Sequence, residues 1–303
     1  MKFTVKAVPP FDFDLSARIF SDGDKEIHRY EDGRYWQVVR VDKKLILVVI
    51  RTIGTVNEPK LLVELKSNEE ISKSDKKTAQ QIVGSIFNFE LDLKQFYKTV
   101  EIDEVMSRLV QKLIGLKGPA TETVFEALID SIIEQQISLN VANSIERKLI
   151  KALGDILKLD DDIYYAFPTP QKLASANVDH LRECGLSLRK AEYIRDVSAM
   201  IADGKFDLEE LKEYQDVKEI IDELCKIRGV GVWTAELAMI RGMRKQEAMP
   251  ADDLGLRRSI SHYYCKDRRI SAEEARRIAE KWGQWKGLAG FYLIMAERLG
   301  VKS

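Results

Sequence analysis

Hydrophobic and polar positions in the first hundred residues predict a small β-rich domain. Four short apolar stretches have strand character and lie at residues 3–8, 35–41, 45–53 and 60–65. The second and third are joined by the short turn Asp42-Lys43-Lys44. Two stretches with helical spacing follow, at 78–87 and 91–100. An antiparallel sheet with one or two helices fits this pattern, and we predict a β-rich domain over residues 1–100.

From about residue 101 the apolar positions take the spacing of helices. The clearest helix spans residues 122–137, where apolar side chains recur at intervals of one, three and four. Further helices are predicted at 141–153, 191–203, 208–214, 217–226, 233–243, 254–264, 272–282 and 288–299. The predicted fold class is therefore α+β, with a small antiparallel β-rich N-terminal domain and an all-helical region over residues 101–303.

Composition places the chain among soluble globular proteins. Hydrophobic residues make up 45% of the 303 positions and charged residues 32%. The longest apolar run, Leu45–Ile50, is the size of a strand, and the N-terminus turns polar too soon for a signal peptide. The three cysteines, at 184, 225 and 265, are too few and too far apart for a disulfide scaffold, a zinc ribbon or a four-cysteine iron–sulfur cluster. We expect an intracellular protein.

Charge is unevenly distributed along the chain. Residues 225–303 carry 16 Lys and Arg against 9 Asp and Glu, a net of +7, although the whole chain has a net charge of −1. The other 224 residues therefore have a net charge of −8. A basic C-terminal quarter suggests that one face meets an anion, such as a phosphate backbone.

The segment Leu224–Ala235, with the sequence LCKIRGVGVWTA, is the most informative stretch of the chain. Gly229 and Gly231 permit a tight turn and the close approach of another molecule, because neither carries a Cβ. The helix that follows would leave the amide groups of residues 230–234 free to bind a phosphate. An ordinary corner between two helices with a glycine C-cap explains the same residues. A P-loop or a dinucleotide-binding turn is excluded, because no strand precedes the glycines.

A pair of aspartates, Asp252 and Asp253, follows Pro250 and opens a predicted helix. An aspartate at that position commonly accepts a hydrogen bond from the first turn. A single cap uses one carboxylate, so the other is available for a cleft.

These two motifs together resemble the helix-hairpin-helix DNA glycosylase superfamily, and most closely the AlkA-type 3-methyladenine DNA glycosylases. The match rests on Gly-Val-Gly-x-Trp-Thr-Ala and on the downstream Pro-x-Asp-Asp. Further similar segments lie at 167–174, 185–192 and 281–286, so the resemblance runs from about residue 122 to residue 297. It implies two helical lobes, roughly 120–228 and 101–119 plus 229–303, with an active-site cleft between them.

The resemblance implies that Asp253, the second aspartate of the pair, is the catalytic carboxylate. Breaking the bond between deoxyribose and a base builds positive charge on the sugar, which a carboxylate stabilises. The expected activity is removal of alkylated or deaminated purines, such as 3-methyladenine and hypoxanthine, after the base has been flipped out of the duplex. Asp252 is then the better candidate for the helix cap.

Trp233 occupies the position at which bifunctional relatives carry the lysine that forms a Schiff base. Indole supplies no primary amine, so we expect a monofunctional enzyme that leaves an abasic site. Two alternatives stay open: a glycosylase with lyase activity on oxidised bases, and a protein that binds DNA structure without chemistry.

The resemblance also assigns the remaining contacts. The residue that fills the space of the flipped base matches Gln136, with Gln135 as the alternative. The base pocket is expected to use Trp233, Leu237, Trp285, Phe291, Ile294 and Met295. Phosphate contacts fall on Arg228, Gly229, Gly231 and Thr234, and the carbonyls of Cys225, Ile227 and Val230 match those that hold a monovalent or hard cation. No other cofactor is expected, and a monomer acting on double-stranded DNA in the cytoplasm, associated with the nucleoid in a prokaryote, fits this assignment.

Overall fold

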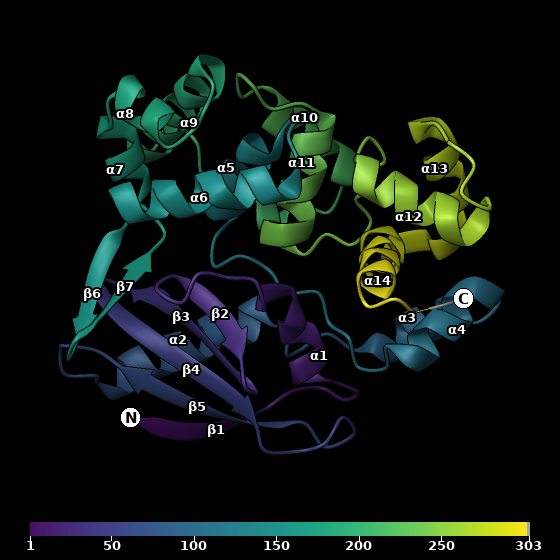
Figure 1. Ribbon diagram of the computed structural model, residues 1–303, viewed down its shortest axis with the longest axis horizontal. Helices are drawn as coiled ribbons and strands as arrows, with labels where there is room; N and C mark the ends of the chain where they lie inside the picture. Colours follow the sequence, from purple (N-terminus) through teal and green to yellow (C-terminus); the bar gives the residue numbers. More distant parts are fainter. Residues whose placement is uncertain (302–303) are drawn as a thin grey trace.

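Five strands form one antiparallel sheet in the computed structural model, which describes residues 1–301 (Figure 1). The strand order is β1–β5–β4–β3–β2, with bounds Lys2–Lys6 (β1), His28–Glu31 (β2), Arg34–Val41 (β3), Lys44–Thr52 (β4) and Lys60–Lys66 (β5). One face of the sheet packs on α1 (Phe13–Ala17) and α2 (Lys73–Ile86). The four predicted strands and the helix at 78–87 are confirmed, whereas β2 and α1 were not predicted.

The other face of the sheet is covered by a hairpin that the sequence did not indicate. Strands β6 (Asp155–Leu159) and β7 (Asp162–Ala166) pack against β3 and β4. Side chains alternate between the two faces of a strand, so one strand can contribute to a core on each side of the sheet. Val38 lies in the core shared with this hairpin, and its neighbour Val39 lies in the core shared with α2. The region after residue 101 is therefore not all helical, and the prediction was wrong on this point.

The remainder of the described chain is helical, and most helices begin at a Ser, Thr or Asp whose side chain accepts a bond from the first turn. The longer helices are α3 (Leu93–Val100), α4 (Glu104–Lys112), α5 (Val124–Glu134), α6 (Leu139–Leu153), α9 (Leu188–Ala202), α10 (Val217–Cys225), α12 (Leu254–Tyr264), α13 (Ala272–Ala279) and α14 (Lys286–Arg298). Shorter ones are α7 (Pro170–Ser175), α8 (Val178–Glu183) and α11 (Val232–Ala238), the last continued by a π-helical turn over Met239–Met243. No helix in residues 1–301 is long and apolar enough to cross a membrane.

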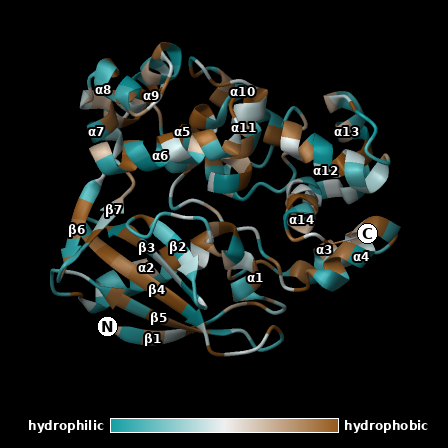
Figure 2. Cartoon of the chain, viewed as in Figure 1, coloured by the Kyte–Doolittle hydropathy of each residue, from teal (hydrophilic) through white to brown (hydrophobic). Residues whose placement is uncertain are grey.

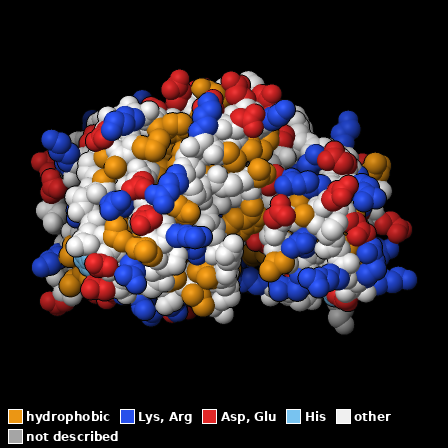
Figure 3. Space-filling view, turned by 90° about the horizontal axis from the view of Figure 1, so that it is seen from above, with side chains coloured by type: hydrophobic (Ala, Val, Ile, Leu, Met, Phe, Trp, Pro, Cys, Tyr) orange, Lys and Arg blue, Asp and Glu red, His pale blue; other side chains and the backbone are white. Residues whose placement is uncertain are grey.

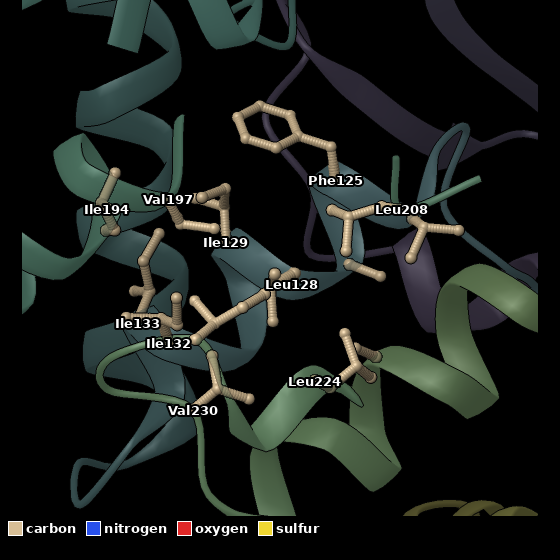
Figure 4. Packing of buried hydrophobic residues seen from close by; sticks show 14 of the residues in the cluster. Phe125, Leu128, Ile129, Ile132, Ile133, Ile194, Val197, Leu208, Leu224 and Val230 are labelled. Carbon is tan, nitrogen blue, oxygen red and sulfur yellow. The ribbon is translucent and has the colours of Figure 1, made fainter. Parts of the chain in front are cut away.

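Two hydrophobic cores organise the helices. The first surrounds α5, whose Leu128, Ile132 and Ile133 meet residues of α9, α10 and the segment after α10, as the close-up shows (Figure 4). Residues 230–248 contribute to this core. The second core joins α3 and α4 to α12, α13 and α14, and α14 is buried around most of its circumference. Figure 2 shows the same distribution, with β3, β4 and α14 predominantly hydrophobic.

Candidate functional site

The turn between α10 and α11 depends on two glycines that have different structural roles. Gly229 has φ +90°, and a Cβ at this position would lie 2.3 Å from the ring of Tyr193. Gly231 has φ −103° and is the N-cap of α11, and a Cβ there would meet nothing within 4 Å. Gly229 is therefore required for the fold. Gly231 leaves an uncovered stretch of backbone at the molecular surface.

The predicted phosphate contacts are less available than the sequence suggested. The amide of Val230 donates to the carbonyl of Ile227 at 3.0 Å, so the expectation that this amide is free was wrong. Thr234 is buried, and its hydroxyl accepts a hydrogen bond from Gln135. Arg228 is exposed and pairs with Glu192 and Asp196 on α9 at 3.1 and 3.2 Å. The backbone around Gly231 is thus the most accessible of the predicted contacts.

Asp253, not Asp252, caps α12, which reverses the sequence-based assignment. Asp253 Oδ1 accepts a hydrogen bond from the amide of Leu256 at 2.7 Å. Its second oxygen, Oδ2, makes no hydrogen bond with any residue in the described range 1–301. The reason for the reversal is the bend of the preceding backbone, in which the amide of Asp253 donates to Pro250 O at 2.9 Å. One carboxylate thus both fixes its own position and keeps one oxygen available.

Arg276 of α13 anchors the segment that carries this aspartate. Its guanidinium makes two hydrogen bonds to the buried carboxylate of Glu236 on α11, at 2.7 and 3.0 Å, and one to Met249 O at 2.8 Å. Asp252 Oδ2 lies 3.8 Å from the same guanidinium. Burial raises the pKa of Glu236, and the charge of Arg276 opposes that rise. Arg276 therefore joins α11, α13 and the segment that precedes α12.

The predicted pocket residues fall into two groups. Trp233 of α11 and Phe291 of α14 are half-buried, Ile294 of α14 is exposed, and Phe291 packs against Gly118. Leu237 of α11 is buried, although it belongs to neither of the two helical cores. Trp285 and Met295 are buried in the second core, and Met295 is 1% exposed, so packing within α14 and its neighbours accounts for it. The indole N–H groups of Trp233 and Trp285 are buried without a hydrogen-bond partner among the described residues.

Gln135 and Gln136, the two candidates for the residue that enters DNA, have different environments. The side-chain amide of Gln135 donates to Gly229 O at 2.9 Å and to Thr234 Oγ1 at 3.0 Å. Gln136 is exposed and has φ +57°. Only Gln136 projects from the surface.

Sequence reasoning missed a partly buried ion pair at the end of α5. Arg241, in the π-helical turn, makes two hydrogen bonds to Glu134, the last residue of α5, at 2.6 and 3.0 Å. Burial disfavours the charged guanidinium, but Glu134, and beyond it Asp130 and Asp253, raise the pKa of Arg241. Arg241 therefore lies within electrostatic range of Asp253. The signal available in the sequence was the helical spacing of acids along α5, which we did not interpret.

The carbonyls predicted to hold a cation are only partly committed to other bonds. Ile227 O accepts from Val230, whereas Cys225 O and Val230 O accept no backbone hydrogen bond within residues 1–301. Burial raises the pKa of the Cys225 thiol, which disfavours a thiolate ligand. No cluster of three or more His, Cys, Asp and Glu side chains suited to a metal occurs in the described part of the chain.

Basic side chains gather on the part of the molecule that carries α12 and α13. Figure 3 shows this part as a smaller mass rich in Lys and Arg, separated by a hollow from the larger mass. Several of these cations are already paired, as Arg258 is with Glu297 and Arg268 with Glu274. Exposed Leu254, next to Asp253, adds an apolar side chain that is 73% exposed. A charged surface of this kind suits a phosphate backbone.

Comparisons with known proteins identify the family of this chain. Residues 129–284 match the family model of the HhH-GPD superfamily base excision DNA repair proteins. A DNA-3-methyladenine glycosylase of Bacillus subtilis is 26% identical over 285 residues, which cover 93% of each chain. The structure of a 3-methyladenine DNA glycosylase from Archaeoglobus fulgidus superimposes with a TM-score of 0.86 at 28% identity, covering 99% of this chain and 100% of that one.

An 8-oxoguanine glycosylase/lyase of Clostridium acetobutylicum, solved with double-stranded DNA, has the same fold, with a TM-score of 0.77 at 23% identity and coverage of 99% of this chain and 98% of that one. The family match spans more than half of the 303 residues and includes both the hairpin and the aspartate pair. The chain belongs to the HhH-GPD superfamily of base excision DNA repair proteins, and its enzyme class is that of the DNA glycosylases.

Proposed function

We propose that this chain is a monofunctional DNA glycosylase that flips an alkylated or deaminated purine out of duplex DNA and hydrolyses its N-glycosidic bond. The single observation that carries the proposal is the carboxylate of Asp253. One of its oxygens is held by the amide of Leu256, and the other has no partner within residues 1–301. Such a carboxylate keeps its orientation while it interacts with a substrate.

Asp253 supplies the chemistry that base removal requires. As the bond to the base breaks, positive charge develops on the deoxyribose, and a carboxylate beside it lowers the energy of that state. The same group orients or deprotonates the water that attacks the sugar. An alkylated base already carries positive charge and leaves readily, so it needs no separate general acid.

The absence of a suitable amine supports hydrolysis without strand cleavage. Trp233 stands at the position where lyases of this superfamily carry lysine. The lysines nearest to it in the sequence are engaged elsewhere, since Lys226 pairs with Glu223 at 2.6 Å and Lys245 donates to Tyr214 O at 2.6 Å. The product is therefore an abasic site in an intact strand.

The residues around the proposed pocket favour a damaged purine. Trp233 is half-buried, and its indole N–H has no partner among the described residues. An indole attracts a cationic alkylated base more strongly than its neutral parent. The other walls of the proposed pocket are apolar, and of Leu237, Phe291 and Ile294 only Phe291 is aromatic. A pocket with few aromatic rings also suits neutral bases such as hypoxanthine.

The proposed DNA contacts lie at two exposed segments, the hairpin between α10 and α11 and the turn after α5. Gln136 fills the space left by the flipped base, and the backbone around Gly231 approaches a phosphate. The carbonyls of Cys225 and Val230 have the capacity to hold a monovalent or hard cation that bridges to the same phosphate. A monomer suffices for all of these contacts.

The proposal is tested by base release from two substrates, a duplex carrying hypoxanthine and DNA treated with a methylating agent. Wild type, Asp253→Asn and the matched control Asp252→Asn are compared, and each sample is divided for treatment with or without hot alkali. We expect wild type and Asp252→Asn to release the base, with strand breaks appearing only after alkali. Asp253→Asn is expected to lose at least about 100-fold in rate.

Three outcomes would contradict the proposal. Strand breaks without alkali, together with a covalent complex trapped by borohydride, would establish a lyase. Equal rates for wild type and Asp253→Asn would remove the catalytic assignment. Binding to damaged DNA with no release of any base would leave a structural role in DNA binding.

A further inference from the structure

The turn after α5 sends three consecutive side chains to three different places. Glu134 pairs with Arg241, Gln135 bonds to the hairpin between α10 and α11, and Gln136 extends into solvent. Gln136 also has a left-handed backbone, with φ +57°, which is uncommon for residues other than glycine. The surrounding contacts therefore determine both the path of this backbone and the direction of the exposed side chain.

Gln135 connects the turn to the hairpin through both donors of its amide group. Nε2 donates to Gly229 O at 2.9 Å and to the hydroxyl of buried Thr234 at 3.0 Å. A side-chain amide has two N–H donors, so both are used inside the protein. The amide donors of Gln135 are thus committed to the fold.

Lys190 binds the backbone of the same turn. Its ammonium group donates to Ile133 O at 2.7 Å and to Gln135 O at 2.6 Å, the carbonyls at the C-terminal end of α5. A positive charge is favourable at this end of a helix. Lys190 lies in the first turn of α9, whose N-cap Ser187 fixes the start of the helix. Burial lowers its pKa, as expected for an ammonium group withdrawn from water.

These bonds join three segments that are far apart in the sequence. The end of α5, the start of α9 and the segment from Gly229 to Thr234 are joined by four hydrogen bonds, three of which involve Gln135. Movement of Gln136 relative to the hairpin would break at least two of them. A phosphate bound at the hairpin would therefore fix the position of Gln136 relative to the DNA strand.

We propose that Gln135 and Lys190 are positioning residues that hold Gln136 ready to enter the DNA stack. The proposal rests on the function proposed above, in which Gln136 occupies the space of the flipped base. It also assigns a role to Lys190. This residue lies in the segment at 185–192, which resembles the family but has no part in the catalytic site. It also separates the two glutamines, one internal and one inserted.

The experiment uses a DNA duplex with one tetrahydrofuran abasic analogue and 2-aminopurine placed opposite it. Insertion of a side chain at the abasic position unstacks the 2-aminopurine and raises its fluorescence, whichever damaged base the enzyme prefers. Six single variants of the full chain are compared with wild type, namely Gln136→Ala, Gln135→Met, Lys190→Met, Lys190→Arg and the exposed controls Gln171→Met and Lys205→Met. DNA affinity and the melting temperature are measured for each.

Wild type should raise the fluorescence at saturating protein, and both controls should match it. Gln136→Ala, Gln135→Met and Lys190→Met should each reduce the rise by at least about fivefold, because the inserted side chain is lost or misdirected. Lys190→Arg keeps a positive charge and N–H donors at the C-terminal end of α5 and should retain most of the signal. The double variant Gln135→Met/Gln136→Ala should be no worse than Gln136→Ala, since residues that act through one another are not additive.

A full signal from both Gln135→Met and Lys190→Met would overturn the proposal, as would additive losses in the double variant. If Gln135→Met melts far below wild type, the comparison of Lys190→Met with Lys190→Arg decides the question. A full signal from Gln136→Ala, or none from wild type bound to the duplex, would also reject it. The proposed function is tested separately, because base release and its loss in Asp253→Asn do not depend on this fluorescence.

Discussion

Arg241 and Glu134 form a two-point ion pair that ties the π-helical turn after α11 to the last residue of α5, at 2.6 and 3.0 Å. The charge of Asp253 also acts on Arg241. The pair therefore connects the turn that carries Gln136 to a residue within electrostatic range of Asp253, the proposed catalytic residue. A π-helical turn is uncommon, and such turns often occur at functional sites. We infer that the pair stabilises the position of the π-helical turn relative to the end of α5.

Removing one partner of this pair should destabilise the protein. Arg241→Met leaves Glu134 without a counter-charge at a site where its side chain is 17% exposed. The expected loss is about 2–4 kcal/mol in the free energy of unfolding, measured by denaturant titration. Arg268→Met, which breaks the exposed pair with Glu274, is the control and should cost less than about 1 kcal/mol. Equal losses in the two variants would refute a supporting role for Arg241.

The sequence predicted the fold class because most elements have a clear apolar period. The central strands and α5, α6, α9 and α12 follow that period closely. The hairpin β6–β7 was not predicted, because only two of its side chains, Leu157 and Ala166, are fully buried. Its Ile156 and Ile163 are exposed. Its pattern resembles that of a polar loop. Only contact with the outer face of the sheet makes these residues strands.

The site was predicted less completely, because tertiary contacts decide its details. Helix α5 ends at Glu134 and not, as the sequence pattern predicted, at Ile137. Long-range hydrogen bonds of Lys190 and Gln135 stabilise a turn there, and the local sequence does not predict that turn. The sequence analysis favoured Asp252 as the cap of α12, whereas the backbone bend at Pro250 selects Asp253. Met295 was assigned to the pocket by resemblance to the family, but it is buried in the second helical core.

The two hairpin glycines should respond differently to alanine. Gly229→Ala introduces a positive-φ alanine whose Cβ overlaps Tyr193, so a loss of about 1–3 kcal/mol in stability is expected. Gly231→Ala meets no obstacle and should cost less than about 1 kcal/mol. Its effect should appear in DNA binding, because the added Cβ obstructs a phosphate approaching the backbone. Thermal melts and titration with labelled duplex measure the two quantities. Unchanged DNA affinity in Gly231→Ala would argue against contact at this position.

The cap and the chemistry of Asp253 are separable by substitution. Asparagine caps a helix about as well as aspartate, so Asp253→Asn should keep the stability within about 0.5 kcal/mol while base release is lost. Asp253→Ala removes both functions and should lower the stability by about 1 kcal/mol. Denaturant titration and single-turnover base release are measured on the same preparations. A large loss of stability in Asp253→Asn would mean that its inactivity reflects unfolding.

Trp233 should determine the preference between charged and neutral lesions. Trp233→Leu keeps an apolar side chain but removes the electron-rich ring, so release of a cationic methylated purine should fall by about tenfold relative to release of hypoxanthine. The two rates are measured on the same enzyme sample, which cancels differences in active fraction. Equal reductions for both lesions would indicate that Trp233 has a packing role only.

Three acidic side chains, one just before α5, one on α5 and one on α6, should make the stability of the protein depend on pH. Burial raises the pKa of Glu122 to about 7, and burial together with neighbouring carboxylates raises that of Glu126 to about 8 and that of Glu146 to about 7. The unfolded chain releases these protons near pH 4.3, so the folded state binds more protons between the two values. The associated stability is complete below about pH 4.3 and is lost as the pH rises through about 7–8. The urea concentration at the midpoint of unfolding should therefore decrease when the pH is raised from 5.5 to 8.5. This decrease should be smaller in Glu126→Gln than in wild type. Glu219→Gln, at an exposed position of α10, should follow wild type, and an identical pH profile for all three proteins would contradict the assignment.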